Sequence, residues 1–295
     1  MSCLYRTFQT GLYFNKQYTL KTINQGEKEM KKITKIIAFA AAAAMLTACF
    51  TGCGKKGKTL EQVKSAGELV IATSPDFPPF EELNNGNVEG IEIDILNIIC
   101  EKLGVKLKIE QMDFDSVLPG VQAAKYDVGV SGITITPDRE KNTLFTDSYC
   151  LAEQSIVVTE NSPIKAKADL DGKKISVQSG TTAEEFCGKQ GYALSSFQAN
   201  SDAQTALTTG KVDAWVIDNL TAIEMVAAYN AENDSKLVIL DEAMTTEPYA
   251  FACCFGSEDL VAEMNKVLAD LVKDGTVKEI FERYDAPYVS PTENN

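Results

Sequence analysis

Short apolar segments typical of β-strands alternate with segments of helical periodicity along most of the chain. Strand-like segments occupy residues 69–73, 105–112 and 127–130. Between them, residues 116–125 indicate a helix, and an earlier helix is indicated by apolar residues at helical spacing, namely Ile95, Ile98, Ile99 and Leu103. Because strands separated by helices pair side by side in one sheet, this order predicts parallel α/β layering.

A second series of the same kind follows. Its strand-like segments are residues 155–159, 174–178, 212–217 and 237–240. Thr181 and Glu184 have the spacing of a capping box that opens a helix, and residues 219–229 indicate another helix. An amphipathic stripe over residues 260–272 ends near Gly275. Two such series in 295 residues predict two compact units.

Residues 30–48 have the parts of a bacterial secretory signal. A basic start, Met30-Lys-Lys-Ile-Thr-Lys35, precedes an apolar run over residues 36–46 that is too short for an ordinary spanning helix. Leu46-Thr-Ala-Cys49 then resembles a lipobox. The alternative is a buried alanine-rich helix, which would carry the basic residues into a core.

Cys49 is the predicted lipid acceptor, with Cys53 as the alternative. Residues 49–66 are then the anchor and tether, and the glycine- and lysine-rich residues 54–58 are its flexible part. Residues 1–29 precede a methionine that already begins a complete signal, so we assign them to a mis-assigned start codon. One acylated cysteine anchors a protein without spanning the membrane. We expect a cell-membrane protein on the extracellular face, periplasmic in a Gram-negative cell.

The charge balance excludes some classes of partner. The chain has 28 basic and 42 acidic residues, and removal of the segment before Cys49 leaves 21 and 40, a formal charge of −19. Such an acidic surface repels nucleic acid and anionic lipid and favours cationic solutes.

Cysteine and histidine usage points away from a metal or redox centre. The five cysteines beyond the leader region are odd in number and include the adjacent pair Cys253-Cys254, so we expect free, mostly buried thiols. The chain has no histidine, which removes the commonest transition-metal ligand and general base. We predict neither a metal site nor a cofactor.

Four segments between residues 67 and 284 resemble the bacterial amino-acid-binding proteins of ABC importers, the extracellular solute-binding proteins of family 3. These segments are Phe77-Pro-Pro-Phe80, Gly90-Ile-Glu-Ile-Asp94, Ser131-Gly-Ile-Thr-Ile-Thr136 through Arg139, and Gln178-Ser-Gly-Thr-Thr182. The resemblance implies the two-lobed periplasmic-binding-protein-like II fold with two hinge strands.

The resemblance also implies roles for individual residues. Arg139 would bind the carboxylate of an amino acid, since a planar guanidinium suits bidentate binding. The same loop would add Ser131, Gly132 and Thr134, and the helix beginning near Thr181 and Thr182 would offer N–H groups. A surface arginine and simple helix capping are the alternatives for Arg139 and for the two threonines.

Asp218 would accept the ammonium group of the ligand, although an Asp-Asn pair before a helix is otherwise an N-cap. Phe77 and Phe114 would flank the stem of the ligand, with a place in the core as the alternative, which we prefer for Phe80. Glu81 and Glu82 are expected to be solvated surface residues.

The side chain of the ligand depends on two departures from relatives. Ser74 stands where some relatives carry aspartate, and Gln178 replaces a lysine of some glutamine binders. Gln178 with Thr181-Thr182 favours a basic amino acid, whereas Ser74 argues mildly against a strongly cationic pocket. We expect arginine or lysine before glutamine or cystine.

Residues 68–153 with 247–288 are predicted to form the first lobe and residues 154–246 the second. Closure of the lobes on an amino acid would present the complex to ABC permease subunits, and we expect a monomer that is not an enzyme. The alternatives are a dehydratase of cyclohexadienyl acids on the same fold and an amino-acid-sensing domain.

Overall fold

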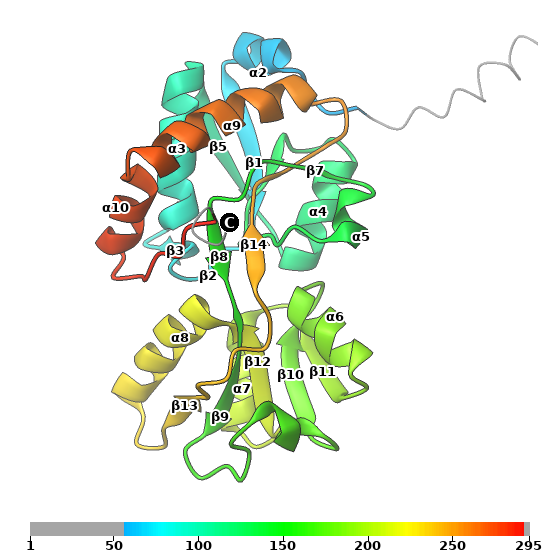
Figure 1. The fold of residues 1–295 in the computed structure, drawn as a ribbon, viewed down its shortest axis with the longest axis vertical. Helices are drawn as coiled ribbons and strands as arrows, with labels where there is room; N and C mark the ends of the chain where they lie inside the picture. The colour runs from blue at the N-terminus through cyan, green and yellow to red at the C-terminus, as the bar shows by residue number, and fades with distance from the viewer. Residues whose placement is uncertain (1–55, 292–295) are drawn as a thin grey trace, which may run out of the picture. The chain divides into compact units, whose positions relative to one another are not determined.

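The computed structural model describes residues 56–291, which form two α/β lobes (Figure 1). The predicted start-codon extension, signal peptide and lipid acceptor all precede these residues. None of the helices between residues 56 and 291 has the length and hydropathy needed to span a membrane.

The first lobe contains a five-stranded sheet in the order β5-β1-β6-β15-β7. As predicted, β1 (Glu68–Thr73) pairs in parallel with β5 (Lys106–Gln111) and with β6 (Val128–Gly129). β15 (Ala252–Cys253) instead pairs antiparallel with β6 and with β7 (Leu144–Phe145). The expectation of parallel layering was therefore wrong at this edge, because β15 enters the sheet on the return of the chain from the second lobe.

The second lobe repeats this plan with the order β11-β10-β12-β9-β13. β10 (Lys174–Gln178) pairs in parallel with β11 (Ala193–Phe197) and with β12 (Ala214–Asp218). β9 (Gln154–Thr159) lies antiparallel to β12 and to β13 (Leu237–Ile239). Parallel pairing places the C-terminal ends of β10 and β12, and so Gln178 and Asp218, at one edge of the sheet.

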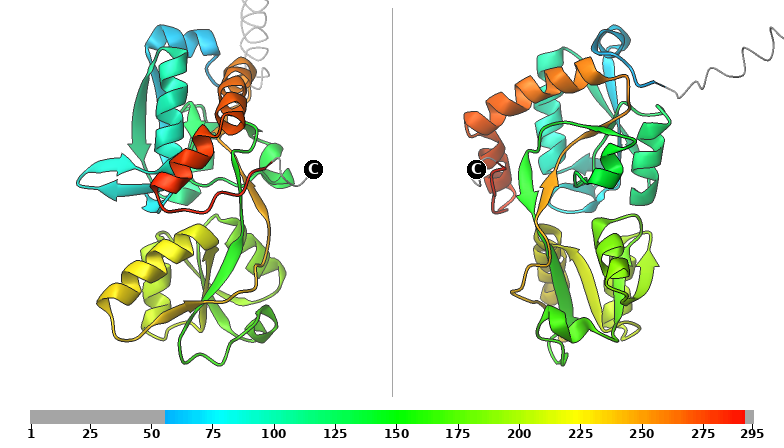
Figure 2. Two further views of the ribbon diagram at one scale, coloured as in Figure 1. Left: turned by 60° about the vertical axis from the view of Figure 1, so that its left-hand side comes forward. Right: turned by 45° about the vertical axis from the view of Figure 1, so that its right-hand side comes forward.

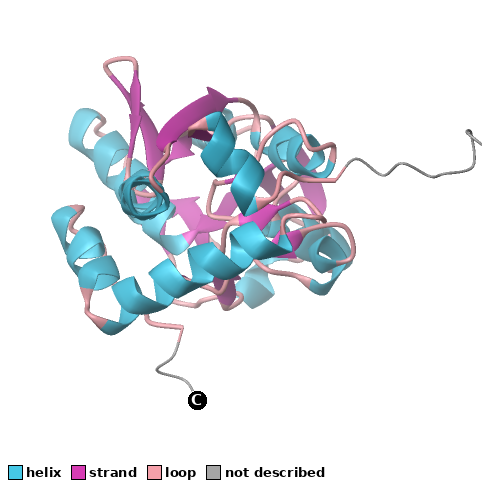
Figure 3. Cartoon of the chain, turned by 90° about the horizontal axis from the view of Figure 1, so that it is seen from above, coloured by secondary structure: helices cyan, strands magenta, loops and turns pink. Residues whose placement is uncertain are grey.

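Helices lie on opposite sides of the strands when the protein is viewed from above (Figure 3). The helices of the first lobe are α2 (Leu60–Ala66), α3 (Ile91–Leu103), α4 (Phe114–Gln122), α5 (Pro137–Glu140), α9 (Glu258–Lys273) and α10 (Thr276–Arg283). Those of the second lobe are the 3-10 helix η1 (Lys167–Leu170), α6 (Thr182–Lys189), α7 (Asn200–Thr208) and α8 (Asn219–Glu232).

Two strands run between the lobes (Figures 1 and 2). β8 (Cys150–Ala152) leads into β9, and β14 (Glu247–Tyr249) follows β13 and pairs antiparallel with β8. The proposed boundaries at residues 153–154 and 247–248 fall at the ends of these strands and stay a prediction.

A small three-stranded sheet and one glycine fix the entry to α3. The sheet consists of β2 (Asp76–Phe77), β3 (Glu81–Asn84) and β4 (Asn87–Glu89). Gly90 has φ 143° and ψ 178°, a region that is open essentially to glycine alone. A Cβ atom there would lie 2.2 Å from the carbonyl oxygen of Phe80. Gly90 thus allows β3 to run close to the start of α3.

The segment before β1 packs against the first lobe and does not form a tether. The Gly57 N–H donates to the Phe255 carbonyl at 2.9 Å, and Lys58 Nζ lies 3.1 Å from Asp127. Val63 of α2 is fully buried. The prediction that residues 49–66 form the anchor and tether, with residues 54–58 as the flexible part, was therefore wrong for residues 57–66, which belong to the folded first lobe.

The cysteines that the structure describes are buried. Cys100, Cys150, Cys187 and Cys253 are free, in agreement with the prediction. Cys254, which follows Cys253 directly, is also buried. Phe80 is fully buried in the core of the first lobe, also as predicted.

Candidate ligand-binding site

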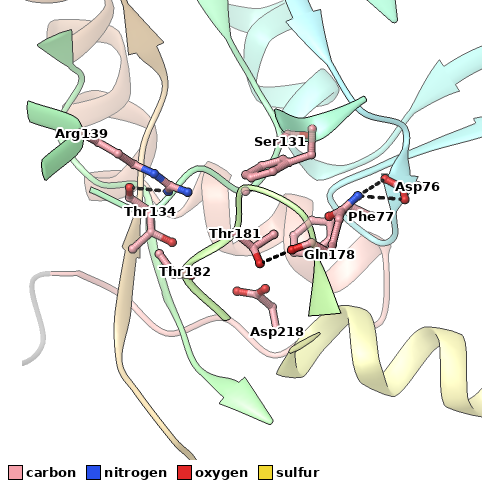
Figure 4. A pocket seen from close by; sticks show the side chains of 11 residues that line it. Asp76, Phe77, Ser131, Thr134, Arg139, Gln178, Thr181, Thr182 and Asp218 are labelled. Carbon is pink, nitrogen blue, oxygen red and sulfur yellow. Dashed lines mark hydrogen bonds between the residues drawn. The ribbon is translucent and has the colours of Figure 1, made fainter. Parts of the chain in front are cut away.

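Side chains from both lobes surround a narrow cavity of about 10 Å³ (Figure 4). Its lining comprises Asp76, Phe77, Phe114, Ser131, Gly132, Thr134, Arg139, Gln178, Thr181, Thr182 and Asp218. Ten of these residues were predicted from the sequence. The other predicted residue, Ser74, lies behind the wall, where its hydroxyl donates to Asp76 Oδ1 at 2.9 Å. Asp76 itself was missed.

Arg139 enters the cavity from α5, which Thr136 caps through a hydrogen bond to the Arg139 N–H. Its Nη1 donates to the Thr134 carbonyl at 2.9 Å, and its Nη2 donates across the lobes to the Gly180 carbonyl at 3.1 Å. The guanidinium also lies 5.9 Å from the centre of the Phe114 ring. A guanidinium has five N–H donors, so donors remain for a further acceptor.

Burial lowers the pKa of Arg139, and the negative charges of Glu247 and Asp218 oppose this shift. An arginine keeps its proton in proteins under such conditions. Arg139 is therefore a fixed, partly desolvated positive charge on the wall of the cavity, unlike an arginine on an exposed turn.

Asp218 is the last residue of β12 and lines the cavity on the side of the second lobe. It stands at the N-cap of α8, but its side chain makes no capping hydrogen bond, so the alternative capping role is not used. Its carboxylate accepts from the Tyr249 hydroxyl. Burial raises the pKa of Asp218 to about 7; Glu247 adds to the rise, and hydrogen bonds from Tyr249 and Gln154 oppose it. A cation beside Asp218 would stabilise its charged form.

Glu247, on the connecting strand β14, is a buried acidic residue that sequence reasoning did not place in the site. Its Oε2 accepts from Thr134 Oγ1 of the first lobe at 2.6 Å and from Thr182 Oγ1 of the second at 2.7 Å. The sequence signal was present, because Glu247 lies at a predicted crossing between the lobes. From the sequence alone, that position indicates only a connection between the lobes.

The turn at Ser131 and Gly132 rests on two buried glutamates. Ser131 Oγ donates to Glu81 Oε1 at 2.7 Å, and the Gly132 N–H donates to Glu92 Oε2 at 2.9 Å. Gly132 has φ +54°, and a Cβ there would lie 2.5 Å from the Phe77 ring. Burial, together with the charge of Glu92, raises the pKa of Glu81 well above its usual range.

The expectation that Glu81 is a solvated surface residue was therefore wrong. Glu81 is fully buried. Side chains two residues apart in a strand share a face, and Leu83 is exposed, so strand alternation does not reveal that Glu81 is buried.

Phe77 and Phe114 line the cavity while remaining largely buried, so their predicted site and core roles coincide. Phe77 stacks on Phe80 with ring centres 5.6 Å apart. These contacts hold the Phe77 ring in one orientation at the wall.

Gln178 and the two threonines complete the second lobe's wall. Gln178 Nε2 lies 3.2 Å from Asp76 Oδ2 across the cavity and 2.9 Å from the Gln198 carbonyl. Thr181 caps α6 by accepting from the Glu184 N–H at 3.2 Å, as predicted. The Glu184 carboxylate accepts from the Gly180 N–H instead of closing the capping box at Thr181.

No group of three or more Cys, Asp or Glu residues within positions 56–291 has an arrangement that would hold a metal ion. Among the residues that line the cavity, Asp76 and Asp218 are acidic and Arg139 is basic. The acidic Glu247, Glu81 and Glu92 accept hydrogen bonds from residues of the lining. The arrangement therefore offers separate sites of opposite charge, with negative charge in excess.

The raised pKa of Asp218 predicts a pH-dependent stability. Its ordinary pKa is 3.8, so the folded protein keeps a proton that the unfolded chain releases; this contribution is present at low pH and is lost as the pH rises from about 4 to about 7. Asp218→Asn cannot ionise. We expect its melting temperature to exceed that of the parent by more at pH 8 than at pH 5, measured by calorimetry.

Asp270→Asn is the matched control, because Asp270 is an exposed residue of α9. Its melting temperature should follow that of the parent at both pH values. An equal offset of Asp218→Asn at pH 5 and pH 8 would contradict the assignment of a buried titrating carboxyl group.

Two curated bacterial proteins are similar to the chain over most of its length. The arginine-binding extracellular protein ArtP of Bacillus subtilis (strain 168) is 26% identical over 247 residues, which cover 82% of this chain and 94% of that protein. The L-cystine-binding protein TcyJ of Escherichia coli (strain K12) is 27% identical over 254 residues, covering 84% of this chain and 92% of that protein.

A solved structure is similar in fold as well as sequence. The arginine-bound form of truncated ArgBP from T. maritima has a TM-score of 0.68 and 39% identity, and the match covers 72% of this chain and 99% of that structure. Residues 69–286 match the family described as bacterial extracellular solute-binding proteins, family 3. The chain therefore belongs to this family of extracellular solute-binding proteins.

Proposed function

We propose that this chain is the substrate-binding lipoprotein of an ABC importer and that it captures a polar L-amino acid, preferentially arginine or lysine. The observation that carries the proposal is that Arg139 of the first lobe and Asp218 of the second line one cavity. A free amino acid brings a carboxylate and an ammonium group, and burying either charge without a partner costs several kcal/mol. The cavity supplies a partner for each.

The ligand carboxylate would bind the remaining N–H donors of Arg139 together with the first N–H groups of α6. The first amides of a helix have no partner within the helix and point at an anion placed there. The ligand ammonium would bind Asp218 and the Ser131 hydroxyl. Phe77 and Phe114 would pack against the aliphatic stem.

The charge balance of the cavity supports a basic ligand. Besides Asp76, whose oxygens already accept from protein donors, two acidic residues, Asp218 and Glu247, face the one basic residue, Arg139. A neutral amino acid adds no net charge to this excess of carboxylates, whereas arginine or lysine adds one positive charge. The arginine-bound relative with 39% identity agrees with this preference. The L-cystine-binding relative supports the alternative of a ligand without a net positive charge.

Binding would be coupled to closure, because Arg139 and Asp218 reach the ligand from different lobes. β8 and β14 would flex as the lobes approach, and the closed form would be the one that the permease subunits bind. Micromolar affinity requires about 8 kcal/mol, which two charge pairs and two aromatic contacts can supply.

One observation supports the alternative function, a dehydratase of cyclohexadienyl acids. The pKa of about 7 at Asp218 would suit a general acid. Asp218 is held by Tyr249 and Gln154 as an acceptor, however, and Glu81, whose pKa is also raised by burial, does not line the cavity. We therefore favour an ammonium-binding role for Asp218 and propose no catalytic residue.

A thermal-shift screen against the twenty amino acids tests the proposal. A ligand at 100 times its Kd stabilises the native state by about 2.7 kcal/mol, which corresponds to roughly 5–10 °C for two lobes of this size. We expect such a shift with arginine or lysine, and Arg139→Ala should abolish it while changing the unliganded melting point little.

Arg283→Ala is the control, because Arg283 lies on α10 in an exposed pair with Asp94. It should keep the full shift. A parent protein that responds to no amino acid would refute the proposal, and a large loss of unliganded stability in Arg139→Ala would assign Arg139 to structure.

Membrane anchoring is tested at the predicted lipid acceptor. Cys49→Ala should move the protein from the membrane fraction to the soluble fraction and abolish incorporation of labelled palmitate, whereas Cys53→Ala should change neither. The opposite pattern would assign the lipid to Cys53, and a parent protein without label would refute the anchor.

A further inference from the structure

Helix α7 of the second lobe begins without a cap of its own. Its N-cap residue is Ala199, whose side chain has no hydrogen-bonding group, although the backbone there is extended as at an ordinary N-cap. The first N–H groups of a helix lack partners within the helix. The Asn200 N–H is the first of these groups in α7.

The acceptor for this N–H comes from the first lobe. Asp76 of β2 accepts from the Asn200 N–H through Oδ2 at 2.9 Å. The same oxygen lies 3.2 Å from Gln178 Nε2, which also belongs to the second lobe. On the side of the first lobe, Ser74 Oγ donates to Asp76 Oδ1 at 2.9 Å. Asn200 Nδ2 in turn donates to Gln178 Oε1 at 3.0 Å, so the groups form one network.

We propose that Asp76 is the closing latch of the cleft: a carboxylate of the first lobe that caps α7 of the second lobe only when the lobes are closed. This inference rests on the proposed function, because it concerns the closure that accompanies capture. Asp76 acts on the equilibrium between open and closed forms and is a positioning residue, not a contact for one kind of ligand side chain.

The physical basis of the latch is a charge-assisted hydrogen bond at a helix N-terminus. The positive end of the helix dipole and an unpartnered N–H both favour a carboxylate at this place. Burial raises the pKa of Asp76, and the hydrogen bonds from Asn200, Ser74 and Gln178 oppose that rise. When the lobes separate, Asp76 loses both partners from the second lobe, and the first amide of α7 returns to water.

The latch has a counterpart in the hydrogen bond from Arg139 Nη2 to the Gly180 carbonyl. Asp76 and Arg139 both line the cavity, so the two bonds close it with one acidic and one basic residue of the first lobe. Arg139 has donors left for a ligand, whereas the oxygens of Asp76 already accept from three side-chain or backbone groups. This difference separates a ligand-binding residue from a closing residue.

Affinity measurements on two ligands test the latch. Asp76→Ala should weaken the binding of arginine and of glutamine, or of any two bound amino acids that differ in side-chain charge, by the same factor of about ten. Asp76→Asn keeps an acceptor without the charge and should fall between Asp76→Ala and the parent. Asp270→Ala, an exposed change on α9, is the control and should leave both affinities unchanged.

Hydrogen exchange at a single amide gives a second readout, measured without ligand and with a saturating amino acid. With ligand, the Asn200 amide of the parent should exchange about ten times more slowly than in Asp76→Ala, since Asp76 is its acceptor in the closed form, and without ligand the difference should be smaller. Amides in the middle of α7, which are bonded within the helix, should exchange at equal rates in the two proteins and show that the fold is intact.

The outcomes separate the latch from the proposed function. Equal exchange of the Asn200 amide in the parent and Asp76→Ala overturns the latch, as does weakening confined to the cationic ligand, which would make Asp76 a side-chain subsite. If the parent binds no amino acid, the proposed function fails, and the exchange rate of Asn200 still decides whether Asp76 caps α7.

Discussion

The account depends on the cost of burying two opposite charges of one small molecule. Each charge needs a fixed counterpart, and here the guanidinium of Arg139 and the carboxylate of Asp218 come from different lobes. Because neither lobe offers both partners, the complete site exists only when the lobes are together. The two connecting strands join the lobes. The Thr134 and Gly180 carbonyls hold the Arg139 guanidinium, the Tyr249 hydroxyl holds Asp218, and two buried glutamates fix the turn at Ser131 and Gly132 in the same wall.

Much of this arrangement could be predicted from the sequence. The strand over residues 174–178 was predicted with the bounds that the structure has, because Ile175 and Val177 alternate with polar residues and the capping Thr181 follows soon after. The cavity collects ten of the eleven predicted residues, since motifs that follow parallel strands meet at one edge of a sheet. The ends of α4 were less accurate: the helix begins at Phe114 instead of residue 116, which places the Phe114 ring beneath Arg139.

The remaining features depend on contacts between distant segments. Asp76 accepts from the Asn200 N–H and Glu247 accepts from the Thr182 hydroxyl, and both donors belong to the second lobe. A local sequence pattern does not indicate such distant partners. Ser74 was placed in the wall by analogy with an aspartate of relatives, but its hydroxyl supports Asp76 from behind. The antiparallel β15 follows from the path of the chain through the second lobe, and strand periodicity does not encode direction. Glu81 looked like a surface residue because a burial pattern over four residues at a hairpin is too short to identify its inner face.

The most direct test of the central claim combines a change in the protein with a change in the ligand. Calorimetric titration should compare arginine with agmatine, which lacks the carboxylate, on the parent protein and on Arg139→Ala. We expect the parent to prefer arginine by roughly 100-fold, the size of a buried charge-assisted pair, and Arg139→Ala to lose this preference. An undiminished preference for arginine in Arg139→Ala would contradict the pairing of Arg139 with the ligand carboxylate.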